Sequence, residues 1–164
     1  MDIKKGLDYK EYLNSSLVEY KEKQLKIEKF IKLQKNVIKK LKTVKEKIDI
    51  LIFAEIYCPD CREVMAVINE IKKYADINLY IFPRKENETE MTKLFGEAKI
   101  PTLVRLNENE KIIGEPFIEF SDEFKKKLEG KSLDEMKEEI YQYRRGKYNN
   151  LIVNEIMDKI LFYR

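Results

Sequence analysis

The feature that most constrains this chain is the segment Cys58-Pro59-Asp60-Cys61, which lies between an apolar run and a helical pattern. About forty residues later the chain carries an isolated Ile100-Pro101-Thr102. The two cysteines are the only ones in the sequence. Two thiols three residues apart at a strand–helix junction come within bonding range on the first helical turn, which favours reversible dithiol–disulfide chemistry.

The two cysteines are expected to differ in reactivity. Cys58 directly precedes the helix that Pro59 begins, where unpaired N–H groups and the positive end of the helix dipole favour a thiolate. Cys61 lies one turn further along and is expected to be more buried. Cys58 should therefore attack a substrate disulfide, and Cys61 should resolve the mixed disulfide that forms. The carboxylate of Asp60 disfavours the thiolate, and Arg62 is a candidate to offset it.

Three other interpretations of the cysteine pair stay open. The pair could be two ordinary buried cysteines, although Pro59 and Pro101 would then be coincidences. It could bind zinc together with carboxylates or across a dimer, since zinc needs four ligands. It could also belong to a redox-responsive binding module, in which the Cys58–Cys61 state controls what the basic N-terminal helix binds, without turnover. We expect no metal and no cofactor, because the absence of histidine excludes a His-ligated metal and a His general base.

Length and composition indicate one globular domain with added elements. The 164 residues are 43% hydrophobic and 38% charged, enough for a core in a helix-rich chain. The first residues lack the apolar core of a secretory signal, and no run of apolar residues is long enough to span a membrane. With no framework of structural disulfides, the expected compartment is the cytoplasm.

Residues 1–46 are expected to form a helical extension that packs on the rest of the chain. Asp8 is a candidate N-cap, and Ser16-Leu17-Val18-Glu19 fits a capping box for a long second helix. The apolar stripe of that helix is expected to pack through five side chains: Phe30, Ile31, Val37, Ile38 and Leu41. Residues 1–48 carry 14 lysines against 7 acidic residues, so a surface for an acidic partner, nucleic acid or a membrane is an alternative use. Nucleic acid is disfavoured because this segment has no arginine and no interleaved aromatic residues.

Residues 47–130 carry a strand–helix–strand pattern followed by a helix and a hairpin. Strands are expected at 48–56 and 77–82, parallel and joined by the helix that begins at Pro59. A capping box at 87–90 predicts the next helix, which Gly96 would end. Strands at 102–106 and 110–114 would form the hairpin. This is an α/β pattern with a four-stranded mixed sheet flanked by helices.

The end of the chain is expected to be helical. One helix begins at Ser121 or Asp122 and stops near Gly130, another begins at Ser132, and a last one covers residues 150–163. Residues 131–164 are therefore expected to form a C-terminal helical extension.

This order of elements, with Cys-Pro-Asp-Cys at the first strand–helix junction, resembles the thioredoxin-like superfamily over about residues 47–130. It is more similar to thioredoxin-related proteins with a Cys-Pro-Asp-Cys centre than to glutaredoxins, whose Gly-Gly after the cis-proline hairpin is replaced here by Ile112-Ile113-Gly114-Glu115-Pro116. The resemblance implies a thioredoxin-like fold with a βαβαββα core and a thiol–disulfide oxidoreductase. Cys58 would be its nucleophile and Cys61 its resolving thiol.

The resemblance also implies a substrate site around the cysteines. Pro101 would be a cis-proline facing them, and the backbone of Ile100 would pair with an extended substrate. The other substrate-contacting residues would be Tyr57, Pro59 and Asp60. The implied partners are disulfide-containing proteins and a reductant that the sequence does not identify.

Three departures distinguish the chain from thioredoxins. Tyr57 stands where thioredoxins usually have tryptophan, and Ile52 stands where they bury a proton-relaying aspartate. Glu55 is the nearest acidic residue before Cys58 and is the candidate for proton transfer. Finally, the N-terminal and C-terminal extensions have no counterpart in a minimal thioredoxin.

Overall fold

The computed structural model describes residues 1–163, and its centre is a four-stranded sheet in the order β2-β1-β3-β4. The strands are β1 (Ile48–Phe53), β2 (Ile77–Phe82), β3 (Thr102–Leu106) and β4 (Ile112–Ile118). Strands β1 and β2 are parallel, whereas β3 is antiparallel to both β1 and β4. The mixed sheet, its βαβ unit and its hairpin are as the sequence predicts.

Two strand boundaries differ from the prediction. The first strand ends at Phe53 rather than at residue 56, because its ladder with β2 ends at the Phe53–Phe82 pair and the chain then turns toward the next helix. The last strand begins at Ile112 and continues to Ile118, rather than ending at residue 114. It includes Pro116, which fits because β4 is an edge strand and a proline there removes no interior ladder bond.

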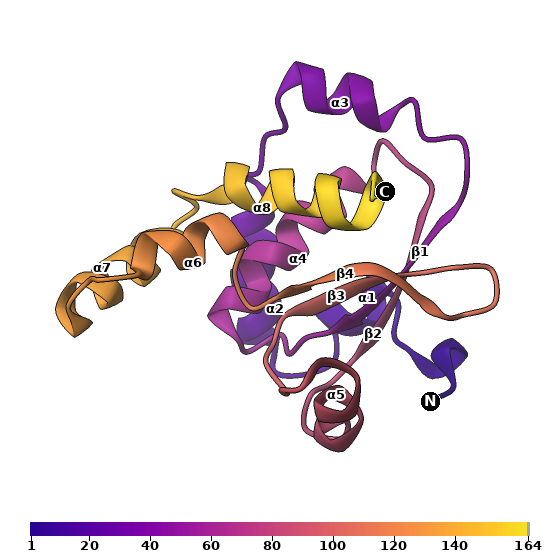
Figure 1. The fold of residues 1–164 in the computed structure, drawn as a ribbon, viewed down its shortest axis with the longest axis horizontal. Coiled ribbons are helices and arrows are strands. Elements are labelled where there is room, and N and C mark those ends of the chain that lie inside the picture. The colour runs from indigo at the N-terminus through magenta and orange to yellow at the C-terminus, as the bar shows by residue number, and fades with distance from the viewer. Residues whose placement is uncertain (164) are drawn as a thin grey trace.

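Helices cover both sides of the sheet. Helix α4 (Pro59–Ile71) connects β1 to β2, and its whole stretch from Glu63 to Ile68 is buried. It packs against α2 (Val18–Glu28) on one side and α8 (Asn149–Glu155) on the other. Helix α5 (Glu88–Phe95) lies on the opposite side of the sheet from α8 (Figure 1).

Helix α5 begins and ends by different means. It ends at Gly96, whose φ of +79° is left-handed and therefore suits glycine, as the sequence predicts. The predicted capping box at its start does not form. The side-chain Nδ2 of Asn87 instead donates a 2.7 Å hydrogen bond to the carbonyl of Pro83, and its side-chain oxygen accepts no hydrogen bond from the first turn of the helix.

The N-terminal segment forms a 3-10 turn, η1 (Ile3–Lys5), and three short helices, α1 (Tyr9–Leu13), α2 and α3 (Lys35–Leu41). Asp8 caps α1 in a capping box with Glu11, as predicted for Asp8. The predicted box at Ser16 is wrong, because the residue at the N-cap of α2 is Leu17 and no side chain caps that helix. The predicted long helix is interrupted after Glu28 and resumes only at Lys35.

The N-terminal segment packs on the sheet and on α4, as expected. The backbone of Leu7 exchanges two hydrogen bonds with Ile81, and Tyr12 is buried in the common core. Of the five apolar side chains predicted at the contact, Ile31 and Leu41 are buried, and Val37 and Ile38 are half-buried. Phe30 is a correction: its side chain is 74% exposed, because the break after α2 turns it away from the core.

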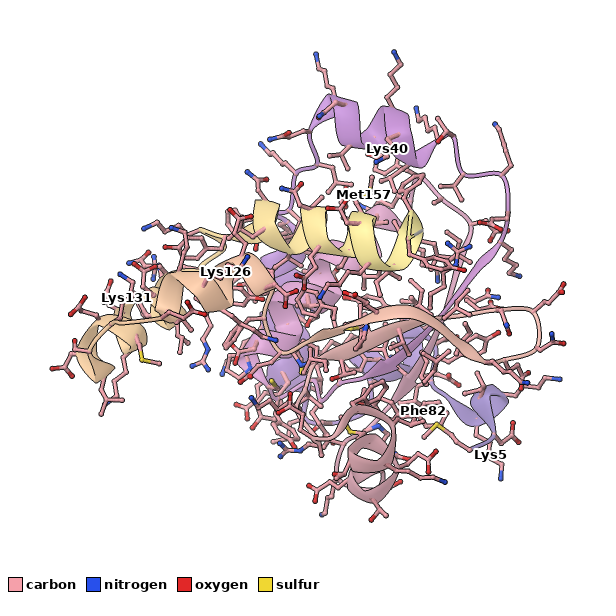
Figure 2. The ribbon with its side chains drawn as sticks, in the orientation of Figure 1. Lys5, Lys40, Phe82, Lys126, Lys131 and Met157 are labelled. Atoms are coloured by element: carbon pink, nitrogen blue, oxygen red, sulfur yellow. The ribbon has the colours of Figure 1, made fainter. Side chains whose placement is uncertain are left out.

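Helix α6 (Asp122–Leu128) follows the sheet. The C-terminal segment then forms α7 (Leu133–Tyr143) and α8, and α8 continues directly into a π-helical turn, η2 (Ile156–Leu161). Ser121 and Ser132 cap α6 and α7 through their hydroxyl groups. Helices α6 and α7 extend to one side of the molecule (Figure 1). Figure 2 labels Lys40 on α3 and Met157 on the last helix, where these two elements lie one above the other.

Arg105, a buried arginine on β3, connects the N-terminal segment of the chain to its C-terminal segment. The guanidinium of Arg105 on β3 donates to the carbonyl of Leu161 at 2.9 Å and to Glu46, just before β1, at 2.6 Å. Within residues 1–163, every helix is too short or too polar to cross a lipid bilayer.

Candidate active site

Cys58 occupies the N-cap of α4, directly before Pro59 at the first helical position. The helix begins there because Pro59 has no N–H to leave unpaired and its φ already suits a helix. The sulfur of Cys58 accepts a 3.3 Å hydrogen bond from the backbone N–H of Cys61. The structure therefore brings Cys58 and Cys61 together on the first turn of α4, both as free thiols.

The two thiols have different environments. Cys61 is fully buried, and this burial raises the pKa of its thiol well above the ordinary value. Cys58 is half-buried. Hydrogen bonds from the side chain and the backbone N–H of Cys61 lower the pKa of the Cys58 thiol, although burial and the charge of Asp60 oppose them. The difference in burial is in the direction that the sequence predicts.

Asp60 forms an ion pair that the sequence analysis missed. Its carboxylate accepts two hydrogen bonds from the guanidinium of Arg144, one from Nε at 2.8 Å and one from Nη2 at 3.1 Å. Arg144 lies at the end of α7, 84 residues along the chain. Because this cation neutralises Asp60, it limits the charge that would otherwise disfavour a Cys58 thiolate.

Arg62, the candidate counter-charge from the sequence, does not pair with Asp60. Residues two apart on a helix point in different directions. The guanidinium of Arg62 instead donates to the carbonyls of Ile56 and Tyr57, at 3.3 and 3.2 Å. Arg62 therefore stabilises the loop that precedes Cys58.

Tyr57 and Glu55 lie on that loop. Tyr57 is 44% exposed, and its ring meets the ring of Tyr20 on α2 edge-on, with 6.3 Å between centroids. The carboxylate of Glu55 accepts a 3.3 Å hydrogen bond from the backbone N–H of Lys85, after β2. Glu55 is thus tied to the loop after β2, and Tyr57 presents an exposed ring beside the cysteines.

The Ile100–Pro101 peptide bond is cis, as predicted, and both residues are buried. Thr102 follows Pro101 and pairs with Phe53, the last residue of β1. Because β1 and β3 are antiparallel, the last residue of β1 and the first residue of β3 lie at the same end of the sheet. That end of the sheet therefore carries both the loop leading to Cys58 and the cis-proline loop.

Tyr12, from α1, is a second residue that the sequence analysis missed. Its hydroxyl has no hydrogen-bond partner within residues 1–163, and burial raises its pKa well above the ordinary value. Negative charge on Cys61 or Cys58 would raise that pKa further, which relates Tyr12 to the thiol pair. Neither Tyr12 nor Arg144 has a local sequence signal, since each depends on a contact between distant segments.

Among the described residues, no group of three His, Cys, Asp or Glu side chains is placed to hold a metal ion.

A parallel βαβ unit, an antiparallel hairpin, a cysteine pair at the first strand–helix junction and a cis-proline before β3 define a thioredoxin-like protein. The sequence agrees: the family model described as thioredoxin matches residues 6–137, and the chain belongs to that family. No curated protein sequence is significantly similar to it.

Two solved structures share the fold. A protein of unknown function from Pseudomonas aeruginosa superposes with a TM-score of 0.79 at 17% identity, covering 94% of this chain and 92% of that one. An HIV epitope scaffold superposes with a TM-score of 0.78, also at 17% identity and with the same coverage. Both likenesses extend over the N-terminal and C-terminal segments as well as the central sheet.

Proposed function

We propose that the protein is a thiol–disulfide oxidoreductase that reduces or exchanges disulfides of protein substrates. The observation that carries the proposal is the asymmetric thiol pair: Cys58 is half-buried with a lowered pKa, and Cys61 is fully buried and donates its backbone N–H to the Cys58 sulfur. This arrangement separates an attacking thiol from a resolving thiol.

The first step is attack by the Cys58 thiolate on one sulfur of a substrate disulfide. A bond forms between that sulfur and Cys58, the substrate S–S bond breaks, and the second substrate sulfur leaves as a thiolate that takes up a proton. Cys61 then loses its proton and attacks the Cys58 sulfur, which breaks the bond between Cys58 and the substrate; the released substrate sulfur leaves as a thiolate and takes up a proton. The substrate leaves as a dithiol and the protein holds a Cys58–Cys61 disulfide, which an external thiol reductant must reduce. Glu55 is the proposed proton-transfer residue.

The substrate is proposed to bind along the cis-proline loop. Among residues 1–163, the N–H and C=O of Ile100 form no hydrogen bond with other backbone groups. These groups could therefore pair with an extended substrate beside the disulfide. Tyr57, Pro59 and Asp60 would contact the same substrate, with Tyr57 offering its exposed ring.

A redox-responsive binding module is the alternative. It is favoured by the contacts of the motif with both extensions, since Asp60 binds Arg144 of the C-terminal segment and Tyr57 contacts Tyr20 of the N-terminal segment. A change of state at the cysteines would then alter those contacts. Such a module would be oxidised and reduced without turning over a substrate.

Insulin reduction with dithiothreitol as electron source tests the proposal. We expect turnover by the wild type, none by Cys58→Ser, and a stalled mixed disulfide with Cys61→Ser. Proteins captured by Cys61→Ser in a cell extract can be identified by mass spectrometry. Oxidation of the wild type without turnover would favour the binding module, and full turnover by Cys58→Ser would refute the assigned roles.

A further inference from the structure

A pocket of about 500 Å³ opens between α2, the start of α4 and the turn that joins α7 to α8. Its volume lies within the range of small-molecule sites. Neither cysteine lines it, so it is separate from the candidate active site. The two are connected through Arg144, which lines the pocket and binds Asp60 of the cysteine motif.

The pocket has a buried carboxyl group in its wall. The side chain of Glu63 is 1% exposed, and its Oε2 forms no hydrogen bond with any residue from 1 to 163. The Oδ1 of Asn149, which also lines the pocket, has no such partner either. A buried polar atom without a partner costs about 1–3 kcal/mol. The five residues that follow Glu63 on α4, from Val64 to Ile68, are all apolar and buried, so packing alone does not account for a carboxyl group here.

Glu63 is a hydrogen-bond donor at neutral pH. Burial raises its pKa to about 8, with Arg62 acting in the opposite direction and Asp60 adding to the rise. The group is therefore mainly a neutral carboxylic acid at pH 7, with an O–H to donate. The charged and titratable groups around it come from α2, α4 and the α7–α8 turn: Lys26, Asp60, Arg62, Tyr143, Arg144 and Arg145.

The rim of the pocket is positively charged. Lys26 and Arg145 both line it, and among the described residues neither forms an ion pair. Arg145 donates only to the phenolic oxygen of Tyr141, at 3.0 Å. With Glu63 neutral and Asp60 already paired with Arg144, these two cations have no compensating charge. A ligand that enters is therefore favoured if it carries negative charge.

The remaining wall is apolar. Ile27 on α2 packs partly on the core, and Phe30 presents a ring that is 74% exposed at the pocket. An exposed aromatic side chain beside a pocket offers a large contact area at little cost in conformational entropy. Together the groups match a molecule with an apolar body and an anionic end.

We propose that this pocket binds a small organic carboxylate with an apolar or aromatic body. The carboxylate accepts a hydrogen bond from the acid group of Glu63 and is attracted by Lys26 and Arg145. The body of the ligand packs on Ile27 and Phe30. Asn149 offers a further acceptor for a hydroxyl or N–H group on the ligand.

The test uses three probes with the same body and different charge: 3-phenylpropionate, 3-phenylpropanol and 3-phenylpropylamine. Binding is followed by amide chemical shifts of the reduced, full-length protein at pH 7. We expect saturable binding of 3-phenylpropionate with a Kd of about 1 mM or lower, and at least about tenfold weaker binding of the amine. The shifts should centre on Ile27, Phe30, Glu63 and Asn149. Equal affinity for the amine, no binding of 3-phenylpropionate, or shifts centred elsewhere would overturn the proposal.

Two exposed residues provide variants that preserve the fold. Phe30→Ser and Lys26→Gln should each weaken binding of 3-phenylpropionate by about fivefold or more. The matched controls are Leu133→Ser, at a side chain that is 76% exposed outside the pocket, and Lys137→Gln, both of which should leave the Kd unchanged. Equal effects of the pocket variants and their controls would refute the assigned contacts.

The pH dependence identifies the role of Glu63. The affinity of the wild type should fall above pH 8, where a Glu63 carboxylate repels the ligand. Glu63→Gln keeps a hydrogen-bond donor without the titration, so it should bind at pH 7 and show no such fall. A decline above pH 8 that persists in Glu63→Gln would contradict this role. The measurement needs no thiol chemistry, so its result is independent of the proposed redox activity.

Discussion

Replacing Arg144 by glutamine tests how the cysteine motif is held by the C-terminal segment. The guanidinium makes two charge-assisted hydrogen bonds to Asp60, at 2.8 and 3.1 Å. Breaking a fully buried pair costs about 3–5 kcal/mol, whereas an exposed pair contributes about 0–1 kcal/mol. Here Asp60 is 8% exposed but the Arg144 side chain is 43% exposed, so solvent screens the pair in part. We expect Arg144→Gln to lower the free energy of unfolding by about 1–2 kcal/mol.

The measurement is urea unfolding of the reduced proteins in a double-mutant cycle with Asp60→Asn. In the Asp60→Asn background, Arg144→Gln should cost less than about 0.5 kcal/mol, because the buried charge that needed a partner is gone. Arg84→Gln is the matched control: its side chain is 40% exposed, but its partner Glu88 is 60% exposed and 3.7 Å away. The control should change stability by less than about 0.5 kcal/mol.

Arg144→Gln should also change the reactivity of the Cys58 thiol. With Arg144 removed, the uncompensated charge of Asp60 disfavours the thiolate, so alkylation of Cys58 by iodoacetamide at neutral pH should become slower. The slowing should disappear in the Asp60→Asn background. An equal loss of stability with and without Asp60, or an unchanged alkylation rate, would refute the argument that Arg144 acts through Asp60.

Three further predictions concern single residues. Limiting iodoacetamide at neutral pH should label Cys58 before Cys61, since Cys58 has the lower pKa and is more exposed; mass spectrometry that finds Cys61 labelled first would reverse the roles. The pKa of Glu63 is about 8 in the folded protein, against 4.5 for an unperturbed glutamate, so the folded state holds an extra proton between those values and stability falls as pH rises through that window. Raising the pH from 5 to 8 should therefore cost the wild type up to about 4 kcal/mol relative to Glu63→Gln in urea unfolding, and parallel pH profiles would exclude this. Leu41→Ala, at a fully buried side chain of α3, should cost about 2–4 kcal/mol, whereas Phe30→Ser should cost less than about 0.5 kcal/mol; equal losses would show that α3 is not anchored as described.

The central fold could be predicted because its signals are local. An apolar run, a proline after Cys58 and an isolated Ile-Pro-Thr each act over a few residues, and together they indicate a strand, a helix start and a cis-proline loop. Gly96 is similar, since a left-handed residue at a helix end is a local requirement. The sequence therefore identified the thioredoxin-like topology and the different burial of Cys58 and Cys61.

The break between the N-terminal helices could not be predicted from local sequence signals. The apolar stripe after Ser16 continues past residue 28 without proline or glycine, so periodicity predicts one long helix. In the structure the helix stops at Glu28, and the chain then buries Ile31 and Leu41 while Phe30 faces outward. That break depends on packing against the rest of the protein, which overrides the intrinsic helix preference.

The residues of the site that the sequence did not reveal also depend on contacts between distant segments. These contacts join the two extensions to the cysteine motif and to the residues next to it. Asp60 is held by Arg144 from α7, the carbonyl of Arg62 accepts a 3.1 Å hydrogen bond from Gln24 on α2, and Tyr57 meets Tyr20 of the same helix. The C-terminal segment therefore contacts the motif itself, and α2 contacts the residues on either side of the motif. The neutralisation of Asp60 is a consequence of its contact with Arg144. Loss of the C-terminal extension would thus leave the charge of Asp60 uncompensated two residues from Cys58, even though that extension contains no cysteine.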